Sequence, residues 1–243
     1  MKQKQIQTNF QRVETKYILD RAILARLEAE MHAYLIPDDY ATSTISNVYF
    51  DNDDFQMIQD SIARRGGREK LRMRTYAAEP TKDSQVFLEI KKKSEDFGFK
   101  YRLVSNLTSV VNYIEKGFAD QTISDERVKA EVELLQERYA GLKPKMVISY
   151  DRYSMKGSED KKVRVAVDSN IRSRDYDVDL TSGRHGYPLL EDDMVIMEIK
   201  VPGEYPEWMS EILHKYGLED QSFSKYGKAC LKSKELVPQA VKV

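Results

Sequence analysis

The stretch REKLRMRTY, residues 68–76, alternates basic and apolar side chains. If it forms a β-strand, successive side chains point to opposite faces of the sheet. One face then carries a row of cations that ends in an aromatic ring: Arg68, Lys70, Arg72, Arg74 and Tyr76. Leu71 and Met73 point the other way, toward a core. Neighbouring cations repel each other, so such a row needs a partner of opposite charge.

The positive charge of this stretch is local, because the chain as a whole is balanced. Its 243 residues include 39 Lys and Arg and 40 Asp and Glu, unlike the basic proteins that coat nucleic acid. With 41% hydrophobic residues the chain can bury a substantial core, and we expect one domain over residues 1–243. The single cysteine, Cys230, excludes an internal disulfide framework and a cysteine-based zinc site.

The sequence also predicts where the protein resides. The N-terminal stretch MKQKQIQTNFQRVETKY lacks the apolar run of a signal peptide. No stretch approaches the roughly 20 apolar residues of a membrane span. We therefore expect a soluble, cytoplasmic protein without a membrane span.

Strand patterns recur along the chain, with helical patterns between them. Alternation predicts strands at residues 10–19, 44–51, 69–77, 85–93, 98–105, 145–155, 162–172 and 194–201. Apolar stripes at helical spacing predict helices at 20–34, 108–118, 124–140 and 207–216. Strands with segregated helices indicate the α+β class, with an antiparallel sheet or barrel and a helical insertion at about 106–142.

One short pattern recurs in separate predicted strands: Glu14-x-Lys16, Glu89-x-Lys91 and Glu198-x-Lys200. In an extended strand, both members of each pair lie on the same face. Other predicted strands carry polar pairs at the same or a related even spacing: Arg72 and Arg74, Lys100 and Arg102, Tyr150 and Arg152, and Arg164 and Asp168. Charged side chains therefore share one face on most of the predicted strands.

Two interpretations fit these faces. In the first, the sheet has one packed and one wet face, and the charges form surface ion pairs of little energetic value. In the second, the sheet closes into a barrel with the charges inside, which is stable only around a polyanion and a metal ion. Phosphate chains fit, because Arg offers a planar fork to phosphate oxygens and Glu supplies hard oxygen ligands for Mg²⁺ or Mn²⁺. The repetition of the pattern favours the second interpretation.

Several motifs occur in a fixed order: RVETKY, EKLRMRTY, FLEIKKK followed by KYR, ISYDRYSM, VRVAVDSNIR, VIMEIKVPGEYPEW and FSKYGKAC. Together they resemble the VTC domain, the polyphosphate polymerase branch of the CYTH-like triphosphate tunnel metalloenzymes, over roughly residues 8–232. The resemblance implies an α+β tunnel of eight antiparallel strands, an eight-stranded β-barrel with flanking helices. It also implies a ligand that is ATP or another nucleoside triphosphate, polyphosphate or tripolyphosphate, with Mn²⁺ or Mg²⁺ as cofactor.

The resemblance also assigns roles to individual residues. The catalytic positions are Arg72, Arg74, Lys91, Arg152 and Lys225. The phosphate-binding positions are Lys16, Lys70, Lys100, Arg102, Arg164, Lys200 and Ser224. The metal ligand falls on Glu198, with Glu14 and Glu89 as further candidates. Two assignments stay open: Ser224 also fits a helix N-cap, and Asp168 fits either a second metal ligand or the counter-ion of Arg164.

The activity implied by the resemblance is that of eukaryotic VTC catalytic subunits, which transfer the γ-phosphate of ATP onto a polyphosphate chain. Hydrolytic members of the superfamily begin with Glu-x-Glu-x-Lys, whereas this chain has Arg12-x-Glu14-x-Lys16, which favours transfer over two-metal hydrolysis. Hydrolysis of tripolyphosphate or a nucleoside triphosphate, and binding of polyphosphate without turnover, stay open as alternatives. We expect no nucleic acid partner, because the aromatic residues fall largely on apolar or turn positions rather than beside the basic strands. The oligomeric state is not predicted.

Overall fold

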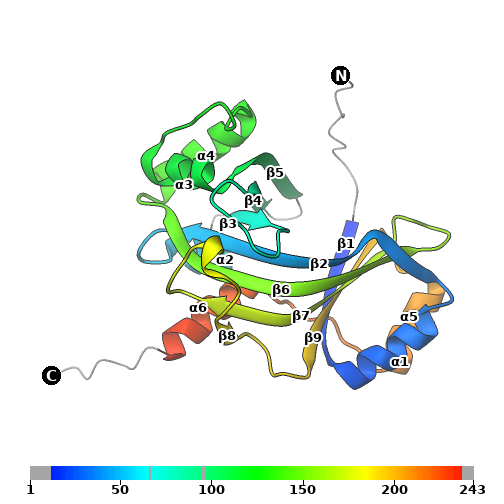
Figure 1. Ribbon diagram of the computed structural model, residues 1–243. Coiled ribbons are helices and arrows are strands. Elements are labelled where there is room, and N and C mark those ends of the chain that lie inside the picture. Colours follow the sequence, from blue (N-terminus) through cyan, green and yellow to red (C-terminus); the bar gives the residue numbers. More distant parts are fainter. Residues whose placement is uncertain (1–11, 66, 95–96, 237–243) are drawn as a thin grey trace. The chain divides into compact units, whose positions relative to one another are not determined.

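Strands with alternating side chains recur along the chain, as expected from the sequence. The computed structural model describes residues 12–65, 67–94 and 97–236 (Figure 1). Its strands are β1 (Arg12–Asp20), β2 (Leu35–Asp51), β3 (Arg68–Thr75), β4 (Gln85–Ser94), β5 (Phe97–Asn106), β6 (Lys143–Gly157), β7 (Arg164–Arg174), β8 (Tyr187–Pro188) and β9 (Met194–Pro202). Its α-helices are α1 (Arg21–Met31), α2 (Gln56–Ala63), α3 (Leu107–Lys116), α4 (Glu126–Arg138), α5 (Glu207–Lys215) and α6 (Lys225–Leu236).

Within the described ranges, nine strands belong to one sheet. Their order is β1-β9-β7-β6-β2-β3-β4-β5, and β8 pairs with β7. The registers of β1 with β9, β9 with β7, and β2 through β5 are antiparallel. The expected α+β class with an antiparallel sheet is therefore confirmed. Among the described residues, no helix has the length and apolar character needed to cross a membrane.

Each predicted strand and helix overlaps an observed element, but several elements were missed. They are β8, α2, α6 and the first part of β2, residues 35–43. Pro37 and the acidic residues after it are unfavourable in a strand, so this part of β2 gave no strand pattern. Helix α2 is short, and its first amides are capped from a distance: the Asp51 carboxylate accepts from the N–H groups of Met57 and Ile58, both at 3.0 Å. Such a cap leaves no local signature.

The chain divides into two compact units, which are described here one at a time. Unit 1 comprises residues 1–43, 151–170 and 190–223, and unit 2 comprises 44–150, 171–189 and 224–243. Strands β2, β6 and β7 contribute residues to both. Each unit has its own hydrophobic core, formed entirely from its own residues.

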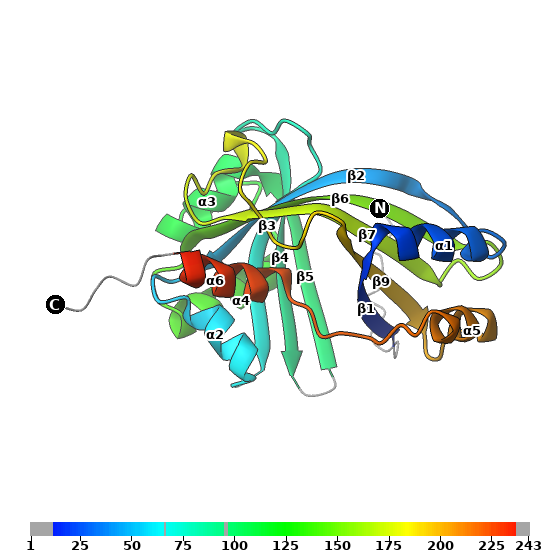
Figure 2. The ribbon, with the colours of Figure 1, turned by 90° about the horizontal axis from the view of Figure 1, so that it is seen from below.

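In unit 1, the core lies between the strands and two helices. Helices α1 and α5 pack against each other (Figures 1 and 2). Helix α1 begins directly after β1, where the Asp20 carboxylate accepts from the N–H of Ile23 at 2.8 Å and so caps the helix. The core includes one alternating set from each strand: Tyr17, Leu19, Val165, Val167, Val195, Met197, Ile199 and Val201. The other alternating set therefore occupies the opposite face of these strands.

In unit 2, strands β3, β4 and β5 likewise bury one alternating set of side chains. Helices α3 and α4 pack on β4 and β5 (Figure 1). The apolar side chains of these strands belong to the unit 2 core: Leu71, Met73, Val86, Leu88, Ile90 and Leu103. Helix α2 packs against β3 and against α6, and its Met57 belongs to the same core (Figure 2). Burial of one alternating set leaves the charged set on the other face.

The segment after β7 is held by a single buried side chain. Arg174 is 1% exposed. Its guanidinium donates to the backbone carbonyls of Asp177 (3.1 Å), Asp179 (2.8 Å), Gly183 (2.8 Å) and His185 (2.9 Å). The fork of Arg suits several acceptors at once, whereas the Lys ammonium is a compact point charge. Arg174 therefore acts as a structural residue.

We expect Arg174→Lys to lower the free energy of unfolding by roughly 2–4 kcal/mol, because buried carbonyls lose their donors. The matched control is Arg172→Lys. Arg172 is an exposed residue of the same strand that donates to the Gly186 carbonyl at 3.0 Å. Urea unfolding followed by circular dichroism measures both variants. Equal losses for the two variants would contradict the structural role of Arg174.

Candidate functional site

The face of β3, β4 and β5 opposite the unit 2 core carries basic side chains in register. Directly opposed residues of antiparallel strands share a face. Three successive rows of this pairing are Lys70, Lys91 and Lys100; Arg72, Glu89 and Arg102; and Arg74, Phe87 and Val104. We call the cations of these rows the basic face: Lys70, Arg72, Arg74, Lys91, Lys100 and Arg102. The expectation that aromatic side chains lie away from the basic strands is wrong for Phe87.

The carboxylate in the middle row, Glu89, is 1% exposed and surrounded by these cations. Arg72 donates to its Oε2 through Nε (2.9 Å) and Nη2 (2.7 Å), and Lys100 Nζ lies 2.7 Å from Oε1. Arg102 and Arg74 approach to 3.4 Å and 3.9 Å. Burial raises the pKa of Glu89, but Arg72, Arg74 and Lys100 outweigh it and lower that pKa to about 2. Glu89 is therefore a carboxylate anion at neutral pH.

Cations on the basic face outnumber the carboxylate among them. The side chains of Lys100 and Arg102 are 46% and 37% exposed, and Lys91 is also exposed, so solvent anions reach this face. Partly desolvated cations held side by side are stabilised by an anion that spans them. The arrangement is suited to binding a polyanion.

Strand β2 adds two polar residues that sequence reasoning missed. Tyr49 pairs with Arg72 and Asn47 with Arg74, so both lie on this face. The Tyr49 hydroxyl accepts from Arg72 Nη1 at 3.2 Å, and Asn47 Oδ1 accepts from Arg74 Nε at 2.8 Å. A signal was present in residues 47–51, where polar residues alternate with Val and Phe. Without its neighbours in the sheet, that alternation does not reveal which cation each residue contacts.

The N-terminus of α6 joins the same face. Arg74 Nη2 donates to the Tyr150 hydroxyl at 3.1 Å, and Lys225 Nζ lies 4.8 Å from the Tyr150 ring centroid. Lys70 Nζ donates to Ser224 Oγ at 2.8 Å. The same Oγ accepts from the N–H of Gly227 at 3.1 Å, so Ser224 is the N-cap of α6. Ser224 thus caps the helix and contacts a predicted phosphate-binding lysine.

Tyr226 holds α6 against β2. Its ring stacks on Tyr49, with centroids 4.5 Å apart, and its hydroxyl donates to Asp51 at 3.1 Å. Asp51 and Tyr226 are buried. This contact positions Lys225 and Ser224 relative to the basic face.

In unit 1, the charged face of β1, β7 and β9 mixes cations with carboxylates. The register aligns Glu14, Lys200 and Arg164 in one row, and Lys16 and Glu198 in the next. Glu198 forms an ion pair with Lys200. Glu14 lies 3.8 Å from both Lys16 and Lys200. Lys16 Nζ also donates to the Phe223 carbonyl at 3.1 Å.

The carboxylates of unit 1 fit a divalent cation that arrives with its ligand. Burial raises the pKa of Glu198, but Lys200, Arg152 and Lys16 outweigh it and hold that pKa well below its ordinary range. Within residues 12–65, 67–94 and 97–236, no three His, Cys, Asp or Glu side chains lie close enough together to hold a metal ion. Mg²⁺ is often bound by one or two carboxylates plus phosphate oxygens. The carboxylate oxygens of Glu198 and Glu14 match that donor set.

The remaining unit 1 cations have carboxylate partners that differ from the expected ones. Asp168 is fully buried and accepts from Arg152 Nε at 2.6 Å and Nη2 at 2.8 Å. Arg164 instead pairs with Asp38. Of the two alternatives left open for Asp168, that of a counter-ion of Arg164 is wrong: the bidentate partner is Arg152, which is thereby held in one orientation.

The predicted site residues thus fall into two sets. Unit 2 brings together Lys70, Arg72, Arg74, Glu89, Lys91, Lys100, Arg102, Ser224 and Lys225. Unit 1 brings together Glu14, Lys16, Arg152, Arg164, Glu198 and Lys200. Convergence of the two sets on one ligand stays a prediction.

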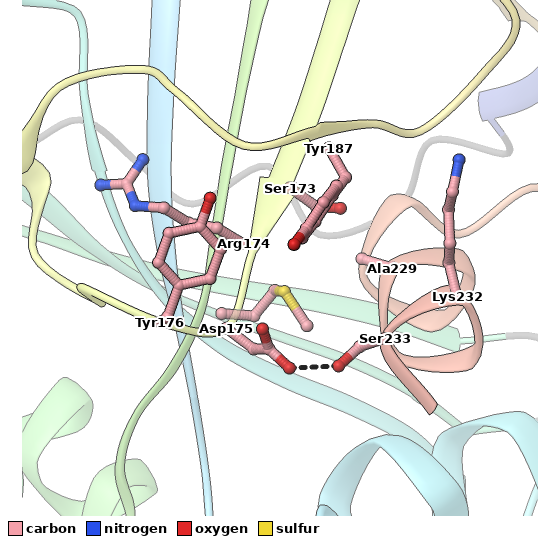
Figure 3. Close-up of a pocket in the computed structure, with 9 residues that line it drawn as sticks. Ser173, Arg174, Asp175, Tyr176, Tyr187, Ala229, Lys232 and Ser233 are labelled. Carbon is pink, nitrogen blue, oxygen red and sulfur yellow. Dashed lines mark hydrogen bonds between the residues drawn. The ribbon is translucent and has the colours of Figure 1, made fainter. Parts of the chain in front are cut away.

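Unit 2 also has a pocket of about 160 Å³ outside the basic face. It is lined by Met146, Ser173, Arg174, Asp175, Tyr176, Tyr187, Ala229, Lys232 and Ser233. Figure 3 shows the Arg174 guanidinium directed away from Lys232, and a hydrogen bond between Asp175 and Ser233. None of the predicted site residues lines this pocket, and its buried arginine is committed to carbonyl oxygens.

Comparisons of the sequence with known proteins agree with one another on the family. A family model of the VTC domain matches residues 11–234. Subunit 4 of the vacuolar transporter chaperone complex of Schizosaccharomyces pombe is 25% identical over 225 residues, which cover 76% of this chain and 31% of that protein. The chain thus spans about a third of the length of this relative.

A solved structure shows the same fold. It is a Bacillus halodurans protein provisionally described as an adenylate cyclase, which aligns with a TM-score of 0.53 and 17% identity. The alignment covers 87% of this chain and 92% of that one. At this identity the likeness concerns the fold alone, which is CYTH-like.

The ionisation of Tyr49 tests the electrostatics of the basic face. Burial raises the pKa of Tyr49, but Arg72, Lys70 and Arg74 outweigh it and lower that pKa to about 8. Because the folded-state pKa lies below the ordinary value near 10, the stabilisation is present above about pH 10 and is lost as pH falls through 8. We expect tyrosinate absorbance at 295 nm to appear near pH 8 and to be absent in Tyr49→Phe. Identical titrations of the two proteins below pH 9 would contradict this electrostatic environment.

Proposed function

This chain belongs to the VTC domain family, and we propose that it is a metal-dependent phosphotransferase that moves the γ-phosphate of ATP onto a polyphosphate chain. The observation that carries this proposal is the basic face of unit 2, where cations surround the buried Glu89 and outnumber it. A chain of phosphates supplies negative charge at short, regular intervals, as this face requires.

Arginines and lysines of the basic face have different tasks in this proposal. Arg72 and Arg74 present planar forks, which bind phosphate oxygens in a bidentate manner and orient them. Lys91 and Lys100 supply point charges that attract the chain. Glu89 and Asn47 accept from the two arginines and so orient their guanidinium groups before substrate arrives. Binding energy is then available for positioning rather than for ordering side chains.

The transfer itself needs no protein nucleophile. A terminal phosphate oxygen of the acceptor chain attacks the γ-phosphorus and forms the new P–O bond. The bond between that phosphorus and the β–γ bridging oxygen breaks, and ADP leaves with the electron pair. Cations of the site stabilise the negative charge on the reacting phosphates.

Glu198 and Glu14 are the residues that would hold Mg²⁺ or Mn²⁺, which when bound would offset phosphate charge. Glu89 stays a further prediction as a metal ligand, although its contacts with Arg72 and Lys100 favour the role of counter-ion. Arg152, fixed by Asp168, is proposed to contact phosphate from the unit 1 side.

Closure of eight strands into one tunnel within a single domain is part of the same proposal. Transfer requires that carboxylates able to hold a metal and the basic face act on one substrate. The family resemblance implies that closed arrangement.

Activity is tested by incubating the purified protein with ATP and Mn²⁺ or Mg²⁺ and separating the products on a gel. We expect long-chain polyphosphate and ADP. Glu198→Gln should lower metal-dependent turnover by roughly 100-fold, because the carboxylate is needed for the ion, and should leave metal-free polyphosphate binding intact. Glu204→Gln, an exposed residue after β9, is the matched control and should be unaffected.

Other products would identify the alternatives. Free phosphate without polymer would indicate a hydrolase, and tight polyphosphate binding without turnover would indicate a binding module. Wild-type turnover and metal dependence in Glu198→Gln would show that this carboxylate is only a counter-ion of Lys200.

Thermal melting tests the anion site without catalysis. A ligand that binds only the folded state raises the melting temperature, so tripolyphosphate should raise it more than equimolar phosphate, and less at high salt. Arg72→Lys should lose part of this gain, because the fork is lost while the charge remains. Arg127→Lys, on the exposed side of α4, should keep all of it. Equal gains from phosphate and tripolyphosphate would contradict a polyanion site.

A further inference from the structure

The basic face ends in a row of apolar side chains, of which Tyr76 and Val104 are exposed and Phe87 is half-buried. Phe87 and Val104 are directly paired and share the row of Arg74. The ring of Tyr76 meets that of Phe87 edge to face, with centroids 5.7 Å apart. Tyr76 and Val104 are 43% and 50% exposed. The Arg102 guanidinium lies 3.7 Å from the centroid of Phe87.

This apolar row, which consists of Tyr76, Phe87 and Val104, does not serve the core. The core of unit 2 lies on the opposite face, where Leu88 is fully buried. An exposed cluster of apolar side chains within a charged surface is typical of a ligand site, whereas a single exposed side chain is not. Two aromatic rings beside an arginine form a surface on which planar heterocycles stack.

The order of groups along β4 indicates which kind of ligand would carry this heterocycle. Phe87, Glu89 and Lys91 follow one another on the same face, and the strand rises roughly 13 Å from Phe87 to Lys91. The apolar row lies at one end, the arginine row follows, and the lysine row lies beyond it. A nucleoside triphosphate has the same order, with a planar base at one end and phosphates at the other. Polyphosphate is charged along its whole length and makes no use of an apolar row.

We propose that the apolar row binds the base of a nucleoside triphosphate whose phosphates lie on the basic face. The inference rests on the proposed function and adds to it a determinant of specificity: Phe87 and Tyr76 distinguish the nucleotide donor from the polyphosphate acceptor. Arg102 either sandwiches the base against Phe87 or moves aside to expose that ring.

Isothermal titration of ATP and of tripolyphosphate, each with Mg²⁺, tests this inference. Phe87→Leu keeps an apolar side chain but removes the ring, so it should weaken ATP binding roughly tenfold. Tripolyphosphate binding should change less than about twofold, because the cations are untouched. The matched control is Phe99→Leu: Phe99 is 50% exposed, and its register with Lys92 places it on the opposite face of β5. That variant should bind both ligands as the wild type does.

Each outcome separates this inference from the proposed function. Wild-type affinity of Phe87→Leu for ATP, or an equal loss for both ligands, would overturn the base site while the phosphate site stands. A wild-type protein that binds neither ligand would overturn both proposals. A short RNA without a triphosphate that binds more tightly than ATP, in a manner dependent on Phe87, would assign the surface to RNA and overturn the nucleotide assignment.

A spectroscopic readout keeps the test independent of variant stability. If Phe87→Leu fails to fold, Tyr76→Leu, which lies just beyond β3, replaces it with the same expectations. In Phe87→Trp, ATP should quench the added fluorescence by stacking, and tripolyphosphate should not. The wild type, whose sole tryptophan is Trp208, supplies the background signal. Equal quenching by the two ligands would contradict a stacked base.

Discussion

The contact between Glu89 and the cations around it is the constraint on which the basic face depends. A buried carboxylate is costly unless it is paired, and here Arg72 and Lys100 contact its two oxygens. In return, Glu89 orients the Arg72 fork and allows the arginines of β3 and β5, the strands on either side of it, to stand close together. It offsets only part of their charge, so the face is ordered before a ligand arrives and still attracts anions. Neutral hydrogen-bond acceptors such as Asn47 and Tyr49 fix the arginines without reducing that attraction.

The two units differ in the balance of charge on corresponding faces. In unit 2 a row of lysines adjoins a row of arginines, with Glu89 between two of the arginines. In unit 1 the carboxylates Glu14 and Glu198 alternate with Lys16 and Lys200 across β1 and β9. The first pattern is suited to binding phosphate oxygens, and the second includes carboxylate oxygens of the kind that divalent cations prefer as ligands. Both arise from the same rule, since each strand buries one alternating set and leaves the other to carry charge.

Much of the fold and of the unit 2 set could be predicted from the alternation of side chains along each strand. Leu71 and Met73 identified the buried side of β3, and the neighbouring arginines the charged side, so the α+β class and the unit 2 set followed from the sequence. Partners across the sheet could not be predicted, because register depends on the whole pairing. Asp168 was therefore left open between a metal ligand and the counter-ion of Arg164, whereas it contacts Arg152. Helix α6 was missed because Gly227 interrupts its pattern, although close packing against the Ser224 side chain explains that glycine. Tyr49 and Asn47 were missed because their role lies in contacts with β3.

The placement of Lys225 and Ser224 on α6 has a consequence for how the protein is made. Unit 2 is assembled from three separate stretches of chain, and the last of them begins at residue 224. Strands β3 to β5 pair locally and have short connections, so they can form early during synthesis. Tyr226 reaches Asp51 and Tyr49 only after some 175 further residues have been translated. Until then, α6 is not in place against the part of β2 that carries Tyr49 and Asp51, or beside the neighbouring cations. A ribosome-bound chain therefore carries an incomplete form of the proposed anion site, whose last component arrives with the final segment of unit 2.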